Sequence, residues 1–328
     1  MKAAVVSAFD RPPRCEDVPE PTASGEHELV VDVLAAGLHP RVRSQADGSH
    51  YTSTGELPLV PGIDGVGRGG DGRLRYFILP DTKLGSMAER TVVDVRRSIV
   101  LPEATSPIAV AAAMNPAMSA WLALRRRVRF EAGQRVLVLG ATGNAGRMAI
   151  QVAKRFGASR IVAAGRRTDR LVGLAALGAT DTVSLEPGEL ARAAADVDVV
   201  IDYVWGAPAA AAMAALITGR ADRGQPLAWI QVGSVAGATS PIPSAALRAA
   251  RLQIVGSGQG SVGTREILDE LPELAREIAA GTFATDAVPV PLADIELAWN
   301  DAATTQRFVI VPRAPRPDDA GSTSSGDR

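Results

Sequence analysis

Cysteine is nearly absent from this sequence, with Cys15 alone among 328 residues. One thiol cannot form an intrachain disulfide, and the lack of disulfides is typical of proteins in a reducing compartment. Histidine is also scarce and is limited to His27, His39 and His50. These few side chains show no spacing typical of zinc ligands, so the sequence predicts no metal centre.

The sequence also has no excess of positive or negative charge. Lys and Arg together number 35 and Asp and Glu 36, which gives a formal net charge of −1 and no electrostatic footprint for nucleic acid or an anionic membrane. The sequence shows no apolar run near the roughly 20 residues of a membrane span. Asp10 and Pro12 cut the N-terminal apolar stretch short of a signal peptide. We therefore expect a cytoplasmic protein with a small-molecule partner and no nucleic-acid or membrane partner.

The pattern along the chain indicates two domains. A length of 328 residues with 46% hydrophobic residues exceeds the usual size of one domain. Short β-type runs broken by Gly and Pro fill the first part and predict a partly open barrel. Strand-length apolar runs then alternate with helical patterns, which predicts an α/β domain with a parallel sheet covered on both faces. The predicted ranges are 1–117 and 118–261 for these domains, 262–313 for a return to the first, and 314–328 for a disordered tail.

A glycine-rich turn opens the second domain. The run "VLVLGATGNAG" leads from a predicted strand into a predicted helix, the context in which a glycine fingerprint indicates dinucleotide binding. Gly143 would allow close approach of a pyrophosphate, and Gly146 would allow tight packing of helix on strand. A Gly-rich turn without a ligand is the alternative. The predicted cofactor-binding residues of this turn are Ala141, Thr142, Gly143, Asn144 and Ala145.

Two arginines follow the second strand of this domain, in the run Gly165-Arg166-Arg167. About 20 residues beyond the fingerprint, an NAD-binding protein places Asp or Glu on the ribose 2′-hydroxyl. Guanidinium groups suit a 2′-phosphate instead, so we predict NADP(H), with Arg166 as the principal contact because it lies nearer the strand end. The alternative is that both arginines begin a solvated helix.

Small residues follow the later strands of the same domain. Ligands of open α/β sheets bind outside the carboxyl ends of the strands. Turns that need glycine only for backbone reasons are the alternative explanation. The residues predicted to border the ribose and nicotinamide are Tyr203, Val204, Gly233, Ser234, Gly256, Ser257 and Gly258.

Three further runs carry a family resemblance: "VLAAGLHPRVRSQADGSHY", "LVPGIDGVGRG" and "AAMNPAMSAWLALRRRVRFEAGQRVLVLG". With the fingerprint, they make residues 1 to about 312 resemble the zinc-independent quinone oxidoreductases, zeta-crystallin-like members of the medium-chain dehydrogenase/reductase superfamily. The resemblance implies a GroES-like β-barrel domain and a Rossmann domain. This chain departs from the family in a shorter segment after Gly67 and in His39, where quinone reductases commonly have asparagine.

The resemblance also bears on metal chemistry. In the related alcohol dehydrogenases, Cys, His and Cys bind the catalytic zinc at positions that correspond here to His39, Ile63 and Asn115. Isoleucine cannot bind zinc, and one imidazole is too few for a catalytic site. A zinc-free reaction suits quinones and α,β-unsaturated carbonyl compounds, because these acceptors delocalise the developing charge themselves.

Candidate catalytic residues follow from the same comparison. Tyr51 matches a tyrosine that borders the substrate pocket in quinone reductases, and its hydroxyl or the His39 imidazole would bind the acceptor carbonyl and deliver a proton. The alternatives are a loop aromatic that only packs and a hydrogen-bonded histidine at a strand end. Asn115 and Ser119 correspond to positions near the nicotinamide, although Ser119 also suits helix packing.

These features together predict an NADPH-dependent reductase of quinones or α,β-unsaturated carbonyl compounds. An enoyl or ketone reductase of a biosynthetic pathway, and an NADPH-binding structural or sensor protein without turnover, are the alternatives. The run "LQIVGSG" predicts a final apolar edge strand, which needs cover. Related reductases pair this edge across a two-fold axis, so a homodimer is expected unless a helix or the C-terminal segment covers it.

Overall fold

The computed structural model describes residues 1–301 and 306–312. These residues divide into two units: Met1–Asn115 together with the described residues from Leu271 onward, and Pro116–Glu270. The sequence-based boundaries fall after residues 117 and 261, so the divisions differ mainly at the second boundary, where 262–270 stay with the second unit. The predicted disordered tail, 314–328, lies outside the described residues.

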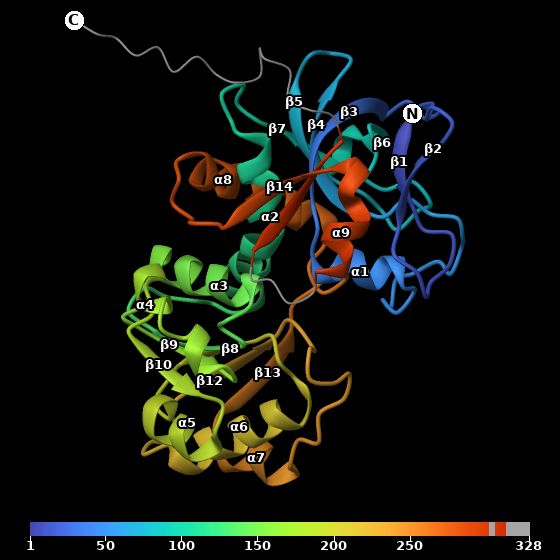
Figure 1. Ribbon diagram of the computed structural model, residues 1–328. Coiled ribbons are helices and arrows are strands. Elements are labelled where there is room, and N and C mark those ends of the chain that lie inside the picture. The colour runs from blue at the N-terminus through green and yellow to red at the C-terminus, as the bar shows by residue number, and fades with distance from the viewer. Residues whose placement is uncertain (302–305, 313–328) are drawn as a thin grey trace, which may run out of the picture. The chain divides into compact units, whose positions relative to one another are not determined.

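The first unit is built on a seven-stranded sheet that is antiparallel except for one pair (Figure 1). Its order is β14-β15-β3-β4-β5-β7, with β6 also paired to β3, and a separate hairpin pairs β1 with β2. The strands are β1 (Lys2–Val5), β2 (Arg14–Asp17), β3 (Glu28–Gly37), β4 (Asp64–Gly69), β5 (Leu74–Ile78), β6 (Arg90–Asp94), β7 (Ser98–Val100), β14 (Ala287–Pro291) and β15 (Arg307–Val311). The helical segments are α1 (Pro40–Ala46), η1 (Val95–Arg97), η4 (Leu292–Asp294) and α9 (Ile295–Asn300).

Local sequence explains how this unit positions His39. Strand β3 ends in a buried apolar stretch, and Pro40 then begins α1 as its first residue. Proline suits that position because its fixed backbone angle matches the helix and its missing N–H is not needed there. His39 is therefore the extended residue that links the end of a core strand to a helix.

The second unit is a Rossmann domain with a six-stranded parallel sheet in the order β10-β9-β8-β11-β12-β13 (Figure 1). Its strands are β8 (Arg135–Leu139), β9 (Arg160–Gly165), β10 (Asp181–Ser184), β11 (Val199–Asp202), β12 (Leu227–Gln231) and β13 (Leu252–Gly256). Its helical segments are α3 (Asn144–Arg155), η3 (Thr168–Arg170), α4 (Leu174–Leu177), α5 (Pro187–Ala194), α6 (Gly206–Gly219) and α7 (Ser244–Ala249). Helix α2 (Pro107–Leu122), extended by a π-helical turn η2 (Ala123–Arg127), leads into this unit, and α8 (Thr264–Ala279) leads out of it.

The strand order creates the place where a ligand can bind. The chain builds outward from β8 to β10 and then returns to place β11 on the other side of β8. All pairings are parallel, so the carboxyl ends of the strands lie at one edge of the sheet. Open α/β sheets bind ligands at such a switch point, which here lies between β8 and β11. The predicted fold class, a GroES-like barrel domain plus a doubly wound parallel sheet, is confirmed.

One sequence-based expectation needs correction. The helix Pro107–Arg127 has 21 residues and is apolar enough, by length and composition, to cross a membrane, although the sequence appeared to contain no such run. Of its most apolar window, 67% is buried inside the protein. A mostly buried apolar helix is also what the core of a soluble protein contains, so length and composition alone do not indicate a membrane span.

Candidate functional site

The glycine turn between β8 and α3 contains glycines of two different kinds. A Cβ atom on Gly146 would lie 2.3 Å from the Gly140 carbonyl oxygen, so the close approach of α3 to the end of β8 requires glycine there. Around Gly143 the same oxygen, at 3.7 Å, would be the only atom of the described residues within 4 Å of such a Cβ atom, and the φ of Gly143, −81°, suits any residue. Neither packing nor backbone geometry explains Gly143, so the open space above it is available to a ligand.

The N-terminus of α3 lies directly beside this space. No side chain in the described part of the chain caps the helix, and its first-turn residues Asn144 and Ala145 are half-buried. The first N–H groups of a helix have no partner inside it, and together with the helix dipole they attract anions. The turn itself is anchored, since the buried Ala141 donates its N–H to the Ala164 carbonyl at 3.0 Å. Thr142 also packs against the end of β9, where a Cβ atom on Gly165 would lie 2.8 Å from its Cγ2.

The two arginines after β9 are not equivalent. Arg167 forms an ion pair with Asp169 at 2.6 Å, and both side chains are more than half exposed. Arg166 is exposed and pairs with no carboxylate in the part of the chain that the structure describes. The guanidinium of Arg166 is therefore the one available for an anionic ligand.

The end of β11 meets the glycine turn across the switch point. A Cβ atom on Gly140 would lie 3.3 Å from the Cβ of Tyr203 and 3.2 Å from a methyl of Val204. The hydroxyl of Ser119 donates to the Pro116 carbonyl at 2.8 Å and lies 2.8 Å from the Tyr203 hydroxyl. With its own proton committed, Ser119 accepts the proton of Tyr203, whose pKa burial raises above the usual value. The structure thus brings Ser119 and Tyr203 together.

Asp202, which the sequence reasoning did not select, shapes this turn. It is fully buried at the end of β11. Its Oδ1 accepts the N–H groups of Val204 at 2.7 Å and Trp205 at 3.0 Å, and its Oδ2 accepts the indole N–H of Trp229 at 3.0 Å. Burial raises the pKa of this carboxyl, whereas its three donors favour the charged form. A carboxylate that ends the apolar run "VVID" is the signal that would have identified it.

The carboxyl ends of β12 and β13 lie at the same edge of the parallel sheet as those of β8 and β11. A Cβ atom on Gly233 would lie 2.9 Å from the Tyr203 carbonyl oxygen, so glycine is needed for the close approach of these two strand ends. Ser234 and Gly258 are exposed, whereas Ser257 is buried and donates its N–H to the Gln231 carbonyl at 2.8 Å. All the predicted cofactor-binding residues belong to the second unit, at the carboxyl ends of its strands or in the helix leading into it. They are Ser119, Ala141, Thr142, Gly143, Asn144, Ala145, Gly165, Arg166, Arg167, Tyr203, Val204, Gly233, Ser234, Gly256, Ser257 and Gly258.

The three candidate catalytic residues lie in the first unit and differ in environment. His39 is 3% exposed, and its Nε2 lies 3.0 Å from Oδ1 of Asp64. Burial lowers the pKa of His39, although Asp64 opposes the shift, so the imidazole is neutral at pH 7. This differs from the expected proton donor, because a neutral imidazole whose proton points at Asp64 has none to deliver at Nδ1.

Tyr51 and Asn115 differ from His39 in burial. Tyr51 is 73% exposed, with its ring centroid 4.2 Å from that of His50. Burial lowers the pKa of His50 to about 4. Asn115 is half-buried within α2. Ile63, at the position of a zinc ligand in alcohol dehydrogenases, packs against the apolar core of the first unit.

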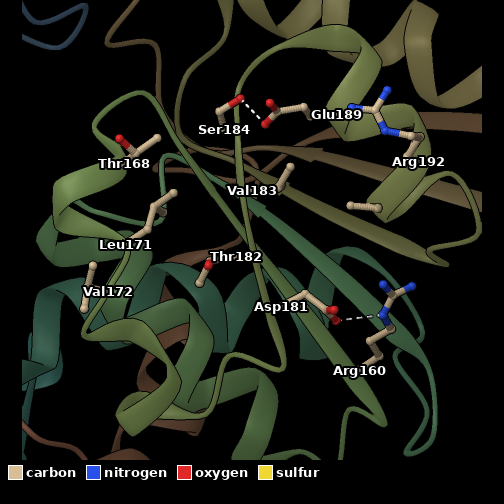
Figure 2. A pocket seen from close by; sticks show the side chains of 11 residues that line it. Arg160, Thr168, Leu171, Val172, Asp181, Thr182, Val183, Ser184, Glu189 and Arg192 are labelled. Carbon is tan, nitrogen blue, oxygen red and sulfur yellow. Dashed lines mark hydrogen bonds and ion pairs between the residues drawn. The ribbon is translucent and has the colours of Figure 1, made fainter.

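A hollow of about 530 Å³ lies along the edge strand β10. Figure 2 shows the side chains that line it. The segment from Thr168 to Val172 borders one side and α5 the other. Its acidic groups are engaged, since Asp181 pairs with Arg160 at 2.9 Å and Glu189 accepts the Ser184 hydroxyl at 2.5 Å. None of the predicted cofactor-binding residues lines the hollow. We assign it no catalytic or binding role, because its acidic side chains already have partners.

The sequence of the chain is similar to those of known NADPH-dependent reductases. No family model matches the chain. The chain is 31% identical over 359 aligned residues to the probable NADPH-dependent quinone reductase tdiC of Emericella nidulans, an alignment that covers 95% of this chain and all of that protein. It is 29% identical over 196 residues to the chloroplastic NADPH-dependent alkenal/one oxidoreductase of Arabidopsis thaliana, covering 55% of this chain and 50% of that protein.

Solved structures of quinone oxidoreductases have the same fold as this chain. The quinone oxidoreductase of Thermus thermophilus, studied alone and in complex with NADPH, has a TM-score of 0.75 and 28% identity, with 95% of this chain and all of that chain covered. The Escherichia coli quinone oxidoreductase, solved in complex with NADPH, has a TM-score of 0.77 at 20% identity, with 95% and 99% covered.

Proposed function

Because the chain belongs to the zinc-independent quinone oxidoreductases of the medium-chain dehydrogenase/reductase superfamily, we propose that it is an NADPH-dependent reductase of quinones and α,β-unsaturated carbonyl compounds. The observation that carries this proposal is the glycine turn at the switch point. Gly143 leaves open space there for which neither packing nor backbone angle gives a reason, and the N-terminus of α3, which no described side chain caps, lies beside that space. A dinucleotide pyrophosphate is the ligand that such a turn accommodates.

The residues at this edge fit NADPH more closely than NADH. The amides of Asn144 and Ala145 would hold the pyrophosphate. Arg166, which pairs with no carboxylate among the described residues, would bind the 2′-phosphate. Tyr203 and Gly233, with the small residues after β13, would border the ribose and the nicotinamide. Once bound, the cofactor would supply a hydride, and this chain would bind and orient the ring.

The acceptor must be activated without a metal ion. Ile63 occupies a position where a zinc ligand would be required, and an apolar side chain cannot coordinate a cation. A quinone or enone spreads the developing negative charge through its own carbonyl group, so it needs only orientation and a proton. Tyr51, an exposed phenol that can exchange its proton with solvent, is the candidate donor, and Asn115 and Ser119 are candidates to orient the nicotinamide.

We expect the purified protein to oxidise NADPH only when a quinone or unsaturated carbonyl compound is present, and to do so equally well after exhaustive chelation. Steady-state loss of NADPH absorbance with a panel of both acceptor classes measures this, with a saturated ketone as the control acceptor. Binding of NADPH without acceptor-dependent turnover would indicate a structural or sensor protein instead. Stoichiometric zinc whose removal abolishes turnover would contradict the metal-free reaction.

We also propose that the protein is cytoplasmic and forms a homodimer through β13. This strand is at the edge of the six-stranded sheet and pairs only with β12 among the described strands. Ser257 donates its N–H to Gln231, so the odd-numbered residues of β13 face β12 and Ile254 presents its backbone groups outward. An apolar edge strand left bare would promote uncontrolled pairing, and a second copy satisfies it by two-fold symmetry.

Light scattering coupled to size exclusion should therefore give a mass close to twice 34.1 kDa at micromolar concentration. Ile254→Pro removes an outward N–H and should shift the protein toward monomer, whereas Ile254→Ala keeps that group and should shift it less. A native mass near that of one chain would refute the dimer.

A further inference from the structure

A buried polar chain surrounds His39 in the first unit. Asp64 on β4 lies between two partners: its Oδ1 is 3.0 Å from Nε2 of His39, and its Oδ2 accepts the Tyr76 hydroxyl at 2.8 Å. All three side chains are at most 3% exposed. The remaining ring nitrogen of His39, Nδ1, is buried and has no hydrogen-bond partner in residues 1–301 and 306–312.

Burial is the main reason that the pKa of His39 is lowered, and the charges around the ring act in both directions. The buried Arg307 on β15 faces the group; burial lowers its pKa to about 10, so it is a cation at pH 7. Arg41 on α1 adds a second positive charge, and Asp64 supplies the negative one. A further proton on His39 would place another cation among these groups without a new counter-ion, so the ring stays neutral.

The neutral ring has its proton at Nε2. A carboxylate only accepts hydrogen bonds, so the nitrogen that faces Asp64 must carry the hydrogen. Nδ1 then holds a bare lone pair, which can accept a hydrogen bond but cannot donate one. A buried acceptor without a partner is unfavourable, and such groups in folded proteins almost always have one.

We propose that Asp64 is a positioning residue that holds His39 as the Nε2–H tautomer, so that Nδ1 accepts a hydrogen bond from a hydroxyl group on the bound acceptor substrate. This rests on the proposed function and on the buried Nδ1 atom that no described residue satisfies. It assigns a specificity to the site: acceptors that carry a hydroxyl group are favoured over equivalents without one. A site built to hydrogen-bond a hydroxyl rejects the analogue that lacks it, because its own polar group is then left unpaired.

Nitrogen-15 NMR of the histidine side chains measures the tautomer of His39 and needs neither substrate nor turnover. Native protein should show a protonated Nε2 and a bare Nδ1 for His39, assigned by loss of the signal in His39→Asn. In Asp64→Asn, the amide group can donate to Nε2 while its oxygen still accepts from Tyr76, so the variant keeps its hydrogen bonds and the tautomer should invert. A protonated Nδ1 in the native protein would overturn the proposal even if Asp64→Asn failed to fold.

Substrate preference provides the second measurement. We expect kcat/KM for a hydroxymethyl naphthoquinone to exceed that for its methyl ether by at least about tenfold in the native enzyme, and the ratio to fall about tenfold in Asp64→Asn. The control is Asp32→Asn, the same change at a half-exposed carboxylate of β3 that pairs with Arg90, which should leave both the tautomer and the ratio unchanged.

The possible results separate the two proposals. Equal use of the two quinones by the native enzyme would overturn the substrate role of Nδ1 and would indicate that water fills the position. A lack of turnover with both quinones would contradict the proposed function, while the NMR signal would still decide whether Asp64 sets the tautomer.

Discussion

Arg166→Ala should weaken NADPH binding by roughly one to two orders of magnitude and leave NADH binding nearly unchanged. A charge-assisted hydrogen bond to a phosphate contributes about 1.5 to 3 kcal/mol, which corresponds to that change in dissociation constant. NADH lacks the 2′-phosphate, so it loses no contact. Arg166 is the residue to change because its guanidinium has no carboxylate partner among the described residues.

Arg167→Ala is the matched control. It removes the same charge one residue further along the chain, but that guanidinium is already engaged by Asp169 at 2.6 Å. We expect a smaller loss of NADPH affinity than for Arg166→Ala. Titration of both cofactors by fluorescence at one fixed ionic strength measures this, because salt screens exposed charges. Equal losses for NADPH and NADH in Arg166→Ala would rule out the 2′-phosphate contact.

Two glycine substitutions should separate folding from cofactor binding. In Gly146→Ala the new Cβ would lie 2.3 Å from the Gly140 oxygen and 2.7 Å from the Ala141 Cα, both backbone atoms that cannot move aside cheaply. We expect the free energy of unfolding of the cofactor-free protein to fall by about 1–3 kcal/mol, the usual range for overpacking. Denaturant titration measures that loss.

Gly143→Ala is the counterpart within the same turn. Its Cβ would meet only the Gly140 oxygen at 3.7 Å, and its φ of −81° suits alanine, so the free energy of unfolding should be unchanged or slightly higher. The methyl group would occupy the space left for the pyrophosphate, so NADPH and NADH should both bind more weakly. This equal loss contrasts with the selective loss in Arg166→Ala. Unchanged affinity for both cofactors would show that the pyrophosphate does not approach Gly143.

Local patterns were sufficient to predict the elements and their class. The strand, glycine turn and helix over residues 136–155 are contiguous in sequence. The spacing of the glycines alone therefore predicts that Gly146 allows the helix to pack tightly on the strand. The alternation of strands and helices likewise predicts a parallel sheet, because such connections place the carboxyl ends of the strands at one edge. The long apolar helix was the exception: composition alone does not distinguish a core helix from a membrane span, and only the tertiary structure shows that 67% of its most apolar window is buried.

The partners of buried polar groups were decided by the tertiary structure alone. The sequence identified His39 as a candidate acid, but its partner Asp64 lies 25 residues away, and Tyr76 a further 12. Asp202 and Trp229 are likewise 27 residues apart and belong to neighbouring strands. A hydrogen-bond partner depends on which strands pair and in what register, and no short sequence window contains that information. From the sequence, His39 is therefore a candidate proton donor. In the folded protein burial lowers its pKa, the charges of Arg307 on β15 and Arg41 on α1 act in the same direction, and Asp64 on β4 opposes them.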